Sequence, residues 1–420
     1  ALSIANQGHE VYLVEKDTDL GGIARRIHYT LEGLDVQAYL RDVIRKVYRH
    51  PLIHVFHNAA ITDVFGYVGN FVTTVKSDGR VEEIRHGATI LATGADVYRP
   101  TEYLYGEDDR VLTNLELEEQ IAGRDERLMK SRSLVMIQCV GCRNEDRNYC
   151  ARICCGQSVK NALKLKEINP RIDIHILFRD MRTYGFREDH YREASEKDVK
   201  FILYEPEDKP QVQAVEEGGQ PALRVTLPDP ILGKKLAIDA DTIALAAAVI
   251  PASGNREISQ LYKVTLGPDD FFKEAHVKLR PVDFAADGVF LCGTAHYPKH
   301  IPESINQAYG AAGRALTLLS HDIVTVSGSV CEVKENDCVS CGACITACTY
   351  GAIEFRETPQ GRKAWVNPVL CKGDGVCCAK CPTNAIFLKH FTDEELLSQI
   401  DAAFPEEEIV QQFDAAVGDA

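Results

Sequence analysis

Apolar runs of strand length alternate along this chain with stretches of helical periodicity. Three consecutive runs are separated by two such stretches: strands are expected at 134–140, 172–178 and 199–205, and helices at 156–168 and 187–198. A hairpin is expected to follow around 216–220. Strands that alternate with helices predict a parallel βαβ sheet, so residues 133–275 should form an α/β unit.

The N-terminal stretch has the pattern of a second α/β unit that lacks its beginning. A helix end at 1–6 precedes the apolar run 11–15, which ends in Glu15. In a Rossmann unit, a carboxylate at this place hydrogen-bonds a ribose, and the glycine-rich phosphate loop lies about 20 residues earlier. That loop would fall before Ala1, so we expect the sequence to be incomplete at its N-terminus.

Later motifs extend this pattern: LGG at 20–22, ATG at 92–94 and GVFLCGTAHYPKHIPESINQAYGAAGRAL at 288–316. Their order resembles the FAD-binding half of the two-dinucleotide-binding-domain flavoproteins, such as thioredoxin reductase. The resemblance implies a Rossmann-type FAD domain in two parts, 1–132 and 276–325, around a domain that binds NAD(P)H in that family. The acidic residue that usually follows the late glycine is absent, since Thr294 follows Gly293. The residues implied to contact FAD are Glu15, Lys16, Gly21, Gly22, Ala60, Thr93, Gly94, Gly293, Ala295, His296 and Ser304.

Cysteine usage changes the picture of the middle domain. The chain has 15 cysteines, and because we expect a cytosolic protein, whose thiols are kept reduced, metal ligation is favoured over disulfides. Five of them lie in CVGCRNEDRNYCARICC, residues 139–155, where a nucleotide-binding relative has its glycine-rich turn. A strand end and a helix N-terminus can supply four thiolates to a [4Fe-4S] cluster, and the helix dipole favours the negative charge of the cluster. A zinc site and buried free thiols are the alternatives.

A separate module follows the VSGS linker at 326–329 and is expected to occupy 334–390 as an α+β two-cluster ferredoxin domain. Its first run is Cys338-x2-Cys341-x2-Cys344-x3-Cys348, and its second is Cys371-x2-Asp374-x2-Cys377-x3-Cys381-Pro382. In such domains the fourth cysteine of each run ligates the other cluster. One cluster should therefore use Cys338, Cys341, Cys344 and Cys381, and the other should use Cys371, Asp374, Cys377 and Cys348.

Asp374 occupies a position where the repeat calls for cysteine. A carboxylate is a harder ligand than a thiolate, so that cluster could lose an iron and become [3Fe-4S]. Cys378 is an alternative ligand that breaks the register of the repeat, and Cys331 lies outside the pattern without an assigned role. Cys292 is expected to be a core thiol.

Three stretches carry a more specific resemblance: IQCVGCRNEDRNYCARICC, RTYGFREDHYREA and GVFLCGTAHYPKHIPESINQA. They closely resemble the A-type subunits of heterodisulfide reductase and their bacterial relatives, over nearly the whole chain. The resemblance implies that Cys139, Cys150, Cys154 and Cys155 bind a [4Fe-4S] cluster, the third in the chain, and that Cys142 is a bystander. It also places Lys160 near the flavin. A lysine in a helix can instead be solvated.

The family's FAD is the proposed site of electron bifurcation, in which one two-electron donor reduces one high-potential and one low-potential acceptor. The resemblance therefore implies an anaerobic oxidoreductase subunit that passes electrons from a partner donor to ferredoxin and to a second acceptor such as a disulfide. The implied partners are B- and C-type subunits, a small iron-sulfur subunit that delivers electrons, and ferredoxin, with a homodimer inside the larger assembly. The alternatives are an NAD(P)H-dependent ferredoxin or acceptor oxidoreductase and a non-bifurcating conduit to a quinone-linked module.

Charge and hydropathy disfavour two further classes of protein, those that bind nucleic acid and those that span a membrane. The net charge is −15, and the tail at 391–420 contains acidic residues but no Lys or Arg, which disfavours a nucleic-acid partner. The tail is expected to be a solvated or loosely docked helix, with a segment that docks on another protein as the alternative. No apolar run reaches the roughly 18 residues needed to span a bilayer, and we expect a cytoplasmic protein.

Overall fold

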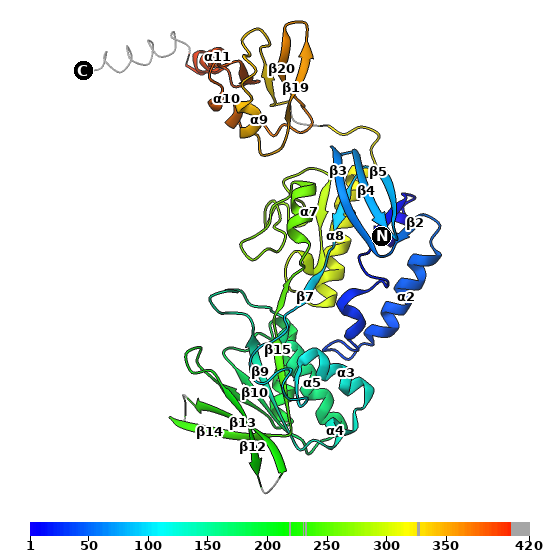
Figure 1. Ribbon diagram of the computed structural model, residues 1–420, viewed down its shortest axis with the longest axis vertical. Helices are drawn as coiled ribbons and strands as arrows, with labels where there is room; N and C mark the ends of the chain where they lie inside the picture. The colour runs from blue at the N-terminus through cyan, green and yellow to red at the C-terminus, as the bar shows by residue number, and fades with distance from the viewer. Residues whose placement is uncertain (218–219, 230, 232, 326–327, 405–420) are drawn as a thin grey trace, which may run out of the picture. The chain divides into compact units, whose positions relative to one another are not determined.

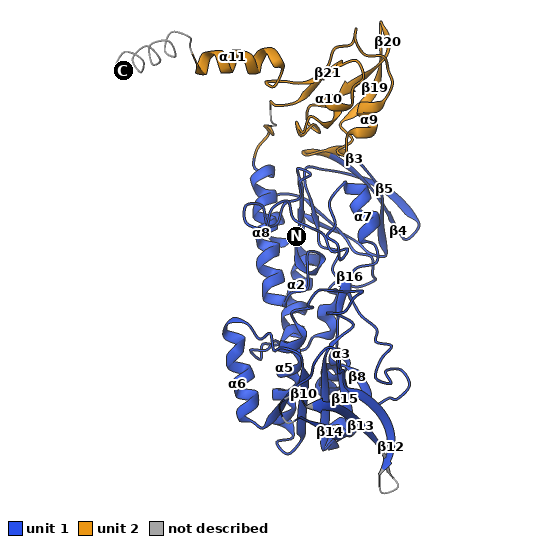
Figure 2. Ribbon diagram, turned by 90° about the vertical axis from the view of Figure 1, so that its left-hand side faces the viewer, with its two compact units in different colours: residues 1–65, 71–320 blue, residues 66–70, 321–420 orange. Residues whose placement is uncertain are grey.

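The computed structural model describes residues 1–404 except 218–219, 230, 232 and 326–327. The chain divides into two compact units, one formed by 1–65 with 71–320 and the other by 66–70 with the chain from residue 321 onward (Figure 2). The expected hairpin turn at 216–220, the linker at 326–329 and the tail at 391–420 lie partly outside the described residues.

A five-stranded parallel sheet is the centre of one part of the first unit (Figure 1). Its order is β11 (Val199–Leu203), β10 (Asp173–Phe178), β9 (Ser133–Val140), β15 (Thr242–Ala247) and β8 (Val111–Thr113), with every neighbouring pair parallel. The parallel βαβ sheet predicted from the sequence is therefore present. It also includes β8, a strand from before residue 133.

Alternating positions of β9 build the two faces of this sheet. Leu134 and Met136 pack with α3 (Asn114–Gly123), α4 (Glu126–Lys130), α5 (Cys154–Ile168) and α6 (Glu188–Glu196). Val135 and Ile137 pack on the opposite side, against an antiparallel sheet of β12 (Gln211–Glu217), β13 (Gln220–Asp229) and β14 (Lys234–Ala240). Since both faces are covered, the strand reads as the continuous apolar run that marks a buried parallel strand.

The other part of the first unit is built around two short parallel pairs. β1 (Val11–Val14) pairs with β2 (Ile53–Phe56), and β6 (Thr89–Leu91) pairs with β17 (Val289–Leu291). The remaining elements are α1 (Leu2–Ala5), α2 (Val36–Arg49), α7 (Asn255–Tyr262), α8 (Ile301–Leu319), the 3-10 turns η1 (Gly22–Arg26), η2 (Gly185–Arg187) and η3 (Gly293–Ala295), the antiparallel sheet β3 (Ala59–Tyr67), β4 (Asn70–Ser77) and β5 (Arg80–His86), and the antiparallel pair β7 (Ala95–Val97) and β16 (Val249–Pro251). Parallel pairing of β6 and β17 places the turns after Leu91 and Leu291 at the same edge.

The second unit repeats one βαβ arrangement. The first copy is β18 (Cys331–Val333), α9 (Ala343–Ala347) and β19 (Ile353–Thr358), and the second is β20 (Gly361–Val366), α10 (Val376–Lys380) and β21 (Ile386–Leu388). β18 pairs with β21 and β19 pairs with β20, both antiparallel. The acidic segment continues as α11 (Asp393–Ala403), which has no buried residue.

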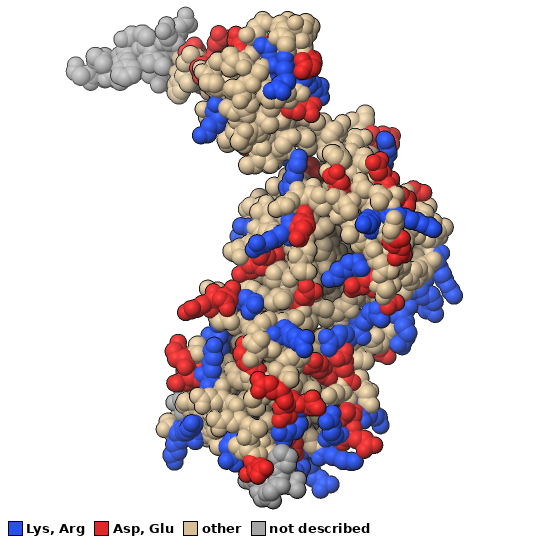
Figure 3. Space-filling model, viewed as in Figure 1, with Lys and Arg blue, Asp and Glu red and all other residues tan. Residues whose placement is uncertain are grey.

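On the face drawn in Figure 3, Lys and Arg side chains gather along the right-hand edge at the level of α2, and elsewhere they are interspersed with Asp and Glu side chains. No helix among the described residues has the length and apolar character that a bilayer span requires.

Gly141, just after β9, has a backbone conformation that favours glycine, with φ of 77°, and a Cβ added there would overlap the ring of Tyr98. We expect Gly141→Ala to lower the free energy of unfolding by about 2–4 kcal/mol, because left-handed strain adds to overpacking. Gly106→Ala is the matched control, since Gly106 has φ of 81° but open space around it, and should cost only about 1 kcal/mol. Equal shifts in the urea midpoints of the two variants would contradict the contact with Tyr98.

Candidate functional site

The five cysteines of 139–155 surround the junction of β9 and α5. Cys139 lies at the end of β9 with φ of 62°, and Cys154 and Cys155 are the first residues of α5, which begins two residues before the expected start at 156. Cys142, Cys154 and Cys155 are buried, and Cys139 and Cys150 are half-buried. All five are free thiols. Cys139, Cys142 and Cys154 pack in one apolar cluster, but no three of the five sulfur atoms all lie within 4.8 Å of one another.

These thiols interact electrostatically with one another. Burial, together with the neighbouring thiol of Cys142, raises the pKa of Cys139 to about 12. The hydrogen bond between Cys154 and Cys155 raises the pKa of Cys154, which burial raises further, and lowers the pKa of Cys155 to about 7.

The surroundings of the thiols suit a negatively charged group. The backbone N–H of Arg152 donates to Cys150 Sγ at 3.3 Å, and Arg143 Nη1 lies 3.8 Å from Cys139 Sγ. No side chain caps the N-terminus of α5, so its first amides remain directed toward the cysteine turn. Soft thiol donors beside a positive helix end are a donor set that fits an iron-sulfur cluster.

A cavity of about 110 Å³, partly open to solvent, adjoins this turn. Its wall comes from η1, the first residues of α3 and α8, and the first two turns of α5. Ile153 and Gly156, which flank the Cys154–Cys155 pair, line it. The mixture of apolar lining and a few polar groups is typical of a cofactor pocket.

Lys160 lines the same cavity but is not solvated. Its side chain is 8% exposed, and its Nζ donates to Glu118 Oε2 at 2.7 Å and to the Tyr29 carbonyl at 2.8 Å. Glu118, from α3, is fully buried and also accepts from the His28 N–H at 2.7 Å. Burial lowers the pKa of Lys160, while the Glu118 carboxylate opposes that shift. Glu118 was not predicted from the sequence, because a glutamate in the helical stretch NLELEEQIAG gives no sign that it is buried.

Two further basic residues of the cavity wall were missed. Lys299 Nζ donates to the carbonyls of Gly293 at 2.5 Å and Tyr297 at 2.8 Å, and burial lowers its pKa to about 8. His300 forms a capping box with Glu303 at the start of α8, and burial lowers its pKa to about 4. The sequence HIPE at 300–303 could have indicated these residues. Its Pro302 and Glu303 are typical of the first turn of a helix, here α8, whose free amides are presented to the cavity.

The other residues predicted to contact FAD lie at neighbouring strand ends, and none of them lines this cavity. Glu15 joins β1 to its neighbours, since its N–H donates to the Phe56 carbonyl and its carbonyl accepts from the Ala59 N–H, both at 2.9 Å. This places Lys16 and Ala60 at the same edge, and Lys16 lies 3.9 Å from Asp96. Gly21 and Gly22 form the left-handed turn that begins η1, with φ of 119° and 48°.

A second cluster of predicted FAD contacts surrounds the turns after β6 and β17. Thr93 Oγ1 donates to Asn255 at 2.9 Å, and the Cys292 N–H donates to the Leu91 carbonyl at 3.1 Å, which brings Thr93 and Gly94 near Gly293. His296 is held between Glu274 at 2.9 Å and Gln307 at 2.7 Å, beyond the fully buried Ala295, and Ser304 lies in the first turn of α8. Gln307 Oε1 is buried without a hydrogen-bond partner among the described residues, so a bound group could satisfy it. Cys292 is buried in an apolar cluster, as expected for a core thiol.

In the second unit, one cavity is lined by Cys338, Cys341, Cys344 and Cys381, the four residues assigned to the first cluster. The residues assigned to the second cluster are arranged differently. Cys371 Sγ accepts from the Cys331 N–H at 3.4 Å, and Cys348 Sγ accepts from the Ala352 N–H at 3.4 Å. Asp374 is exposed, and its Oδ1 accepts from the Val376 N–H at 3.2 Å.

Comparison with known proteins defines the class. A model of the 4Fe-4S dicluster domain matches residues 337–385. The fold is similar to thioredoxin reductase of T. acidophilum (TM-score 0.50, 13% identity, 76% of this chain and 94% of that one) and of Lactococcus lactis (TM-score 0.52, 14% identity, 76% and 94%). The fold class predicted from the sequence is confirmed. The chain is an oxidoreductase of the iron-sulfur flavoprotein class.

Curated relatives make the assignment specific. The chain is 31% identical to an A-type iron-sulfur subunit of CoB–CoM heterodisulfide reductase from Methanopyrus kandleri, over 96% of this chain and 75% of the relative. It is 30% identical to the corresponding CoB–CoM heterodisulfide reductase subunit of Methanocaldococcus jannaschii (96% and 74%) and to that of the H(2):CoB-CoM heterodisulfide,ferredoxin reductase of Methanothermobacter thermautotrophicus (97% and 74%). The chain belongs to the family of A-type heterodisulfide reductase subunits, which confirms the resemblance seen in its sequence.

The buried ion pair of Glu118 and Lys160 gives a stability prediction. Glu118→Gln should lower the free energy of unfolding at pH 7 by about 3–5 kcal/mol, because it leaves the ammonium buried without a counter-charge. The double variant Glu118→Gln with Lys160→Met should recover most of this loss. Denaturant titrations of the wild-type protein, both single variants and the double variant provide the measurement.

The pH dependence of the protein's stability follows from the pKa of Lys160. Burial lowers the pKa of Lys160 in the folded state, so the unfolded state binds more protons and stability rises with pH. The loss in free energy of unfolding that Glu118→Gln causes relative to the wild-type protein should therefore become smaller between pH 7 and about pH 10, where the buried amine can lose its proton. A deficit that does not depend on pH and persists in the double variant would show that the ion pair is not its cause.

Proposed function

We propose that this chain is the FAD and iron-sulfur electron-transfer subunit of a heterodisulfide reductase-like complex. A [4Fe-4S] cluster bound by Cys139, Cys150, Cys154 and Cys155 exchanges single electrons with FAD bound at the neighbouring cavity. One observation carries this proposal: the first turn of α5 supplies both the cysteine pair and, through Ile153 and Gly156, part of the cavity wall. The two redox sites thus share one helical turn.

The protein groups around the cavity suit a flavin. FAD, when bound, supplies an electron carrier that takes up two electrons and can release them one at a time. Lys160, fixed by Glu118, presents an ammonium that can hydrogen-bond the ring or offset negative charge on it. Lys299 and the N-terminus of α8 add positive potential on the far side of the cavity. The strand-end residues Glu15 and Lys16, with Gly293, hold the rest of the cofactor.

The cysteine turn also argues against a nicotinamide cofactor in the middle domain. A dinucleotide needs glycines at the first strand-to-helix turn so that backbone amides can approach the pyrophosphate. Here Cys142 and Tyr149 fill that turn and pack in an apolar cluster. The chain is therefore reduced by single electrons from a partner protein, and hydride transfer from NADH is not part of its reaction.

The second unit carries electrons onward through two clusters. Cys338, Cys341, Cys344 and Cys381 hold the first, and Cys348, Cys371 and Cys377 supply three ligands of the second, for whose fourth site Asp374 was predicted. Three relatives are named as subunits of enzymes that act on CoB-CoM heterodisulfide, and one name includes ferredoxin as a second substrate. A disulfide and a ferredoxin are acceptors of different potential, which supports electron bifurcation at the flavin. The proposed partners are B- and C-type subunits and a small iron-sulfur protein that delivers electrons.

The iron content tests the cluster in the cysteine turn. Full-length protein reconstituted anaerobically should bind one FAD and about 11–12 Fe in three clusters. Cys154→Ala should lower the iron content by about 4 per chain, while Cys142→Ser, which changes the proposed bystander in the same turn, should leave it unchanged. Iron near 8 in the wild-type protein, with the cysteines of 139–155 open to alkylation, would contradict the proposal.

The electron donor is tested by stopped-flow mixing under anaerobic conditions. Excess NADH should leave the flavin absorbance unchanged, because the middle domain has no dinucleotide loop. Reduced methyl viologen, a one-electron donor, should bleach the same sample and serves as the positive control. Rapid bleaching by NADH would favour an NAD(P)H-dependent acceptor oxidoreductase instead.

A further inference from the structure

The two halves of the second unit are related by a constant offset of 33 residues, the distance from 338 to 371. Helix α9 (Ala343–Ala347) is carried onto α10 (Val376–Lys380) without a shift. Gly342 and Gly375, which precede these helices, have φ of 77° and 71°. Residues related by this offset can therefore be treated as occupying equivalent places beside the two clusters.

The offset carries Cys341, a wall residue of the first cavity, onto Asp374. The first half thus has a thiol where the second half has a carboxylate. Asp374 already accepts a hydrogen bond at 3.2 Å from the N–H of Val376, the first residue of α10. The second half consequently lacks one thiol relative to the first at this place.

A compensating difference occurs at another pair of equivalent places. The offset relates Cys331 to Ala364 and Phe355 to Leu388. The cross-strand pair Cys331–Leu388 of β18 and β21 therefore corresponds to the pair Ala364–Phe355 of β20 and β19. Both Ala364 and Phe355 line the first cavity. Cys331, in the first half, therefore has the place of a residue that borders a cluster, and it supplies a thiol beside the second cluster where the first cluster has Ala364.

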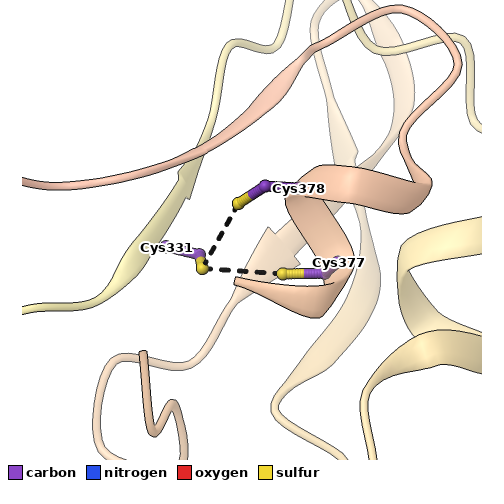
Figure 4. A group of neighbouring side chains, drawn as sticks. All are labelled: Cys331, Cys377 and Cys378. Atoms are coloured by element: carbon purple, nitrogen blue, oxygen red, sulfur yellow. Dashed lines mark hydrogen bonds between the residues drawn. The ribbon is translucent and has the colours of Figure 1, made fainter. Parts of the chain in front are cut away.

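The positions of the sulfur atoms support this. Cys331 is 2% exposed, and its Sγ lies 3.5 Å from Cys377 Sγ and 3.7 Å from Cys378 Sγ (Figure 4). Among the described residues, these three form the one group of at least three His, Cys, Asp or Glu side chains whose ligand atoms all lie within 4.8 Å of one another. The Cys331 N–H also donates to Cys371 Sγ. Cys331 thus contacts two of the residues assigned to the second cluster.

Cys378 is the competing candidate, and the repeat argues against it. The offset carries Cys378 onto Ile345, which packs on the core of the unit and does not line the first cavity. Cys378 is therefore equivalent to a residue that packs in the core, Ile345, whereas Cys331 is equivalent to a residue that lines the first cavity, Ala364.

We propose that Cys331 is the fourth ligand of the second cluster, in place of Asp374, so that Cys331, Cys348, Cys371 and Cys377 bind it. This assignment rests on the proposal that the unit holds two clusters. It keeps four thiolates at each cluster, whereas ligation by Asp374 would give a harder and more labile site. The carboxylate of Asp374 then serves only as the acceptor for the first N–H of α10.

Electron paramagnetic resonance of the full-length protein, reconstituted anaerobically and then oxidised, tests the assignment. Oxidised [4Fe-4S] clusters are silent, and a cluster that has lost the iron at one corner gives a [3Fe-4S] signal. Cys331→Ala should show about one [3Fe-4S] spin per chain. Asp374→Asn, which keeps an oxygen acceptor for the Val376 N–H, and Cys378→Ala, which removes the neighbouring thiol, should remain silent like the wild-type protein.

A rescue variant distinguishes lost ligation from misfolding. Asp374→Cys in the Cys331→Ala background should abolish the [3Fe-4S] signal, because it restores the thiol that the first half has at Cys341. A [3Fe-4S] signal in Asp374→Asn or in Cys378→Ala, with a silent Cys331→Ala, would overturn the assignment. Wild-type protein with a single cluster in this unit would instead overturn the two-cluster function on which the assignment rests.

Discussion

The architecture of the first unit depends on the first turn of α5. A helix N-terminus that no side chain caps must direct its free amides at water, an anion or a ligand. Here they face the turn that carries the five cysteines, and the next residues of the same helix form part of the cavity wall. The parallel sheet fixes this arrangement, because β9 ends where the cysteine turn begins, and both β9 and α5 are buried against neighbouring elements. The proposed cluster and flavin sites are therefore both positioned by α5.

The charges around the cavity follow from burial. Lys160 and Glu118 neutralise each other inside the protein, so the ammonium is retained in a place where an isolated lysine would lose its proton. Lys299 and the start of α8 supply positive potential from another direction. In the second unit, the proposed ligation assigns Cys331 of the first repeat to the second cluster, where the second repeat has Asp374 in place of a cysteine. In the first unit a buried charge is thus paired with an opposite charge, and in the second unit the proposed Cys331 ligand replaces a missing thiolate.

Local sequence signals were sufficient for much of this structure. The apolar run of β9 and the spacing of Cys338, Cys341, Cys344 and Cys348 predicted the sheet and the first cluster, because each depends on neighbours in sequence. Glu118 and Cys331 were missed because their roles depend on partners 42 and 46 residues away, Lys160 and Cys377. The helix start at Cys154 was placed two residues late, since cysteines carry no capping signal.

The proposed function requires that the turn between β9 and α5 hold an iron-sulfur cluster at the place where relatives of this fold have a nucleotide loop. Anomalous diffraction at the iron absorption edge, from crystals grown anaerobically, would locate the iron. We expect a strong peak enclosed by Cys139, Cys150, Cys154 and Cys155, in addition to two peaks in the second unit. Peaks confined to the second unit, with ordered and unligated thiols in the turn, would contradict a cluster at this junction.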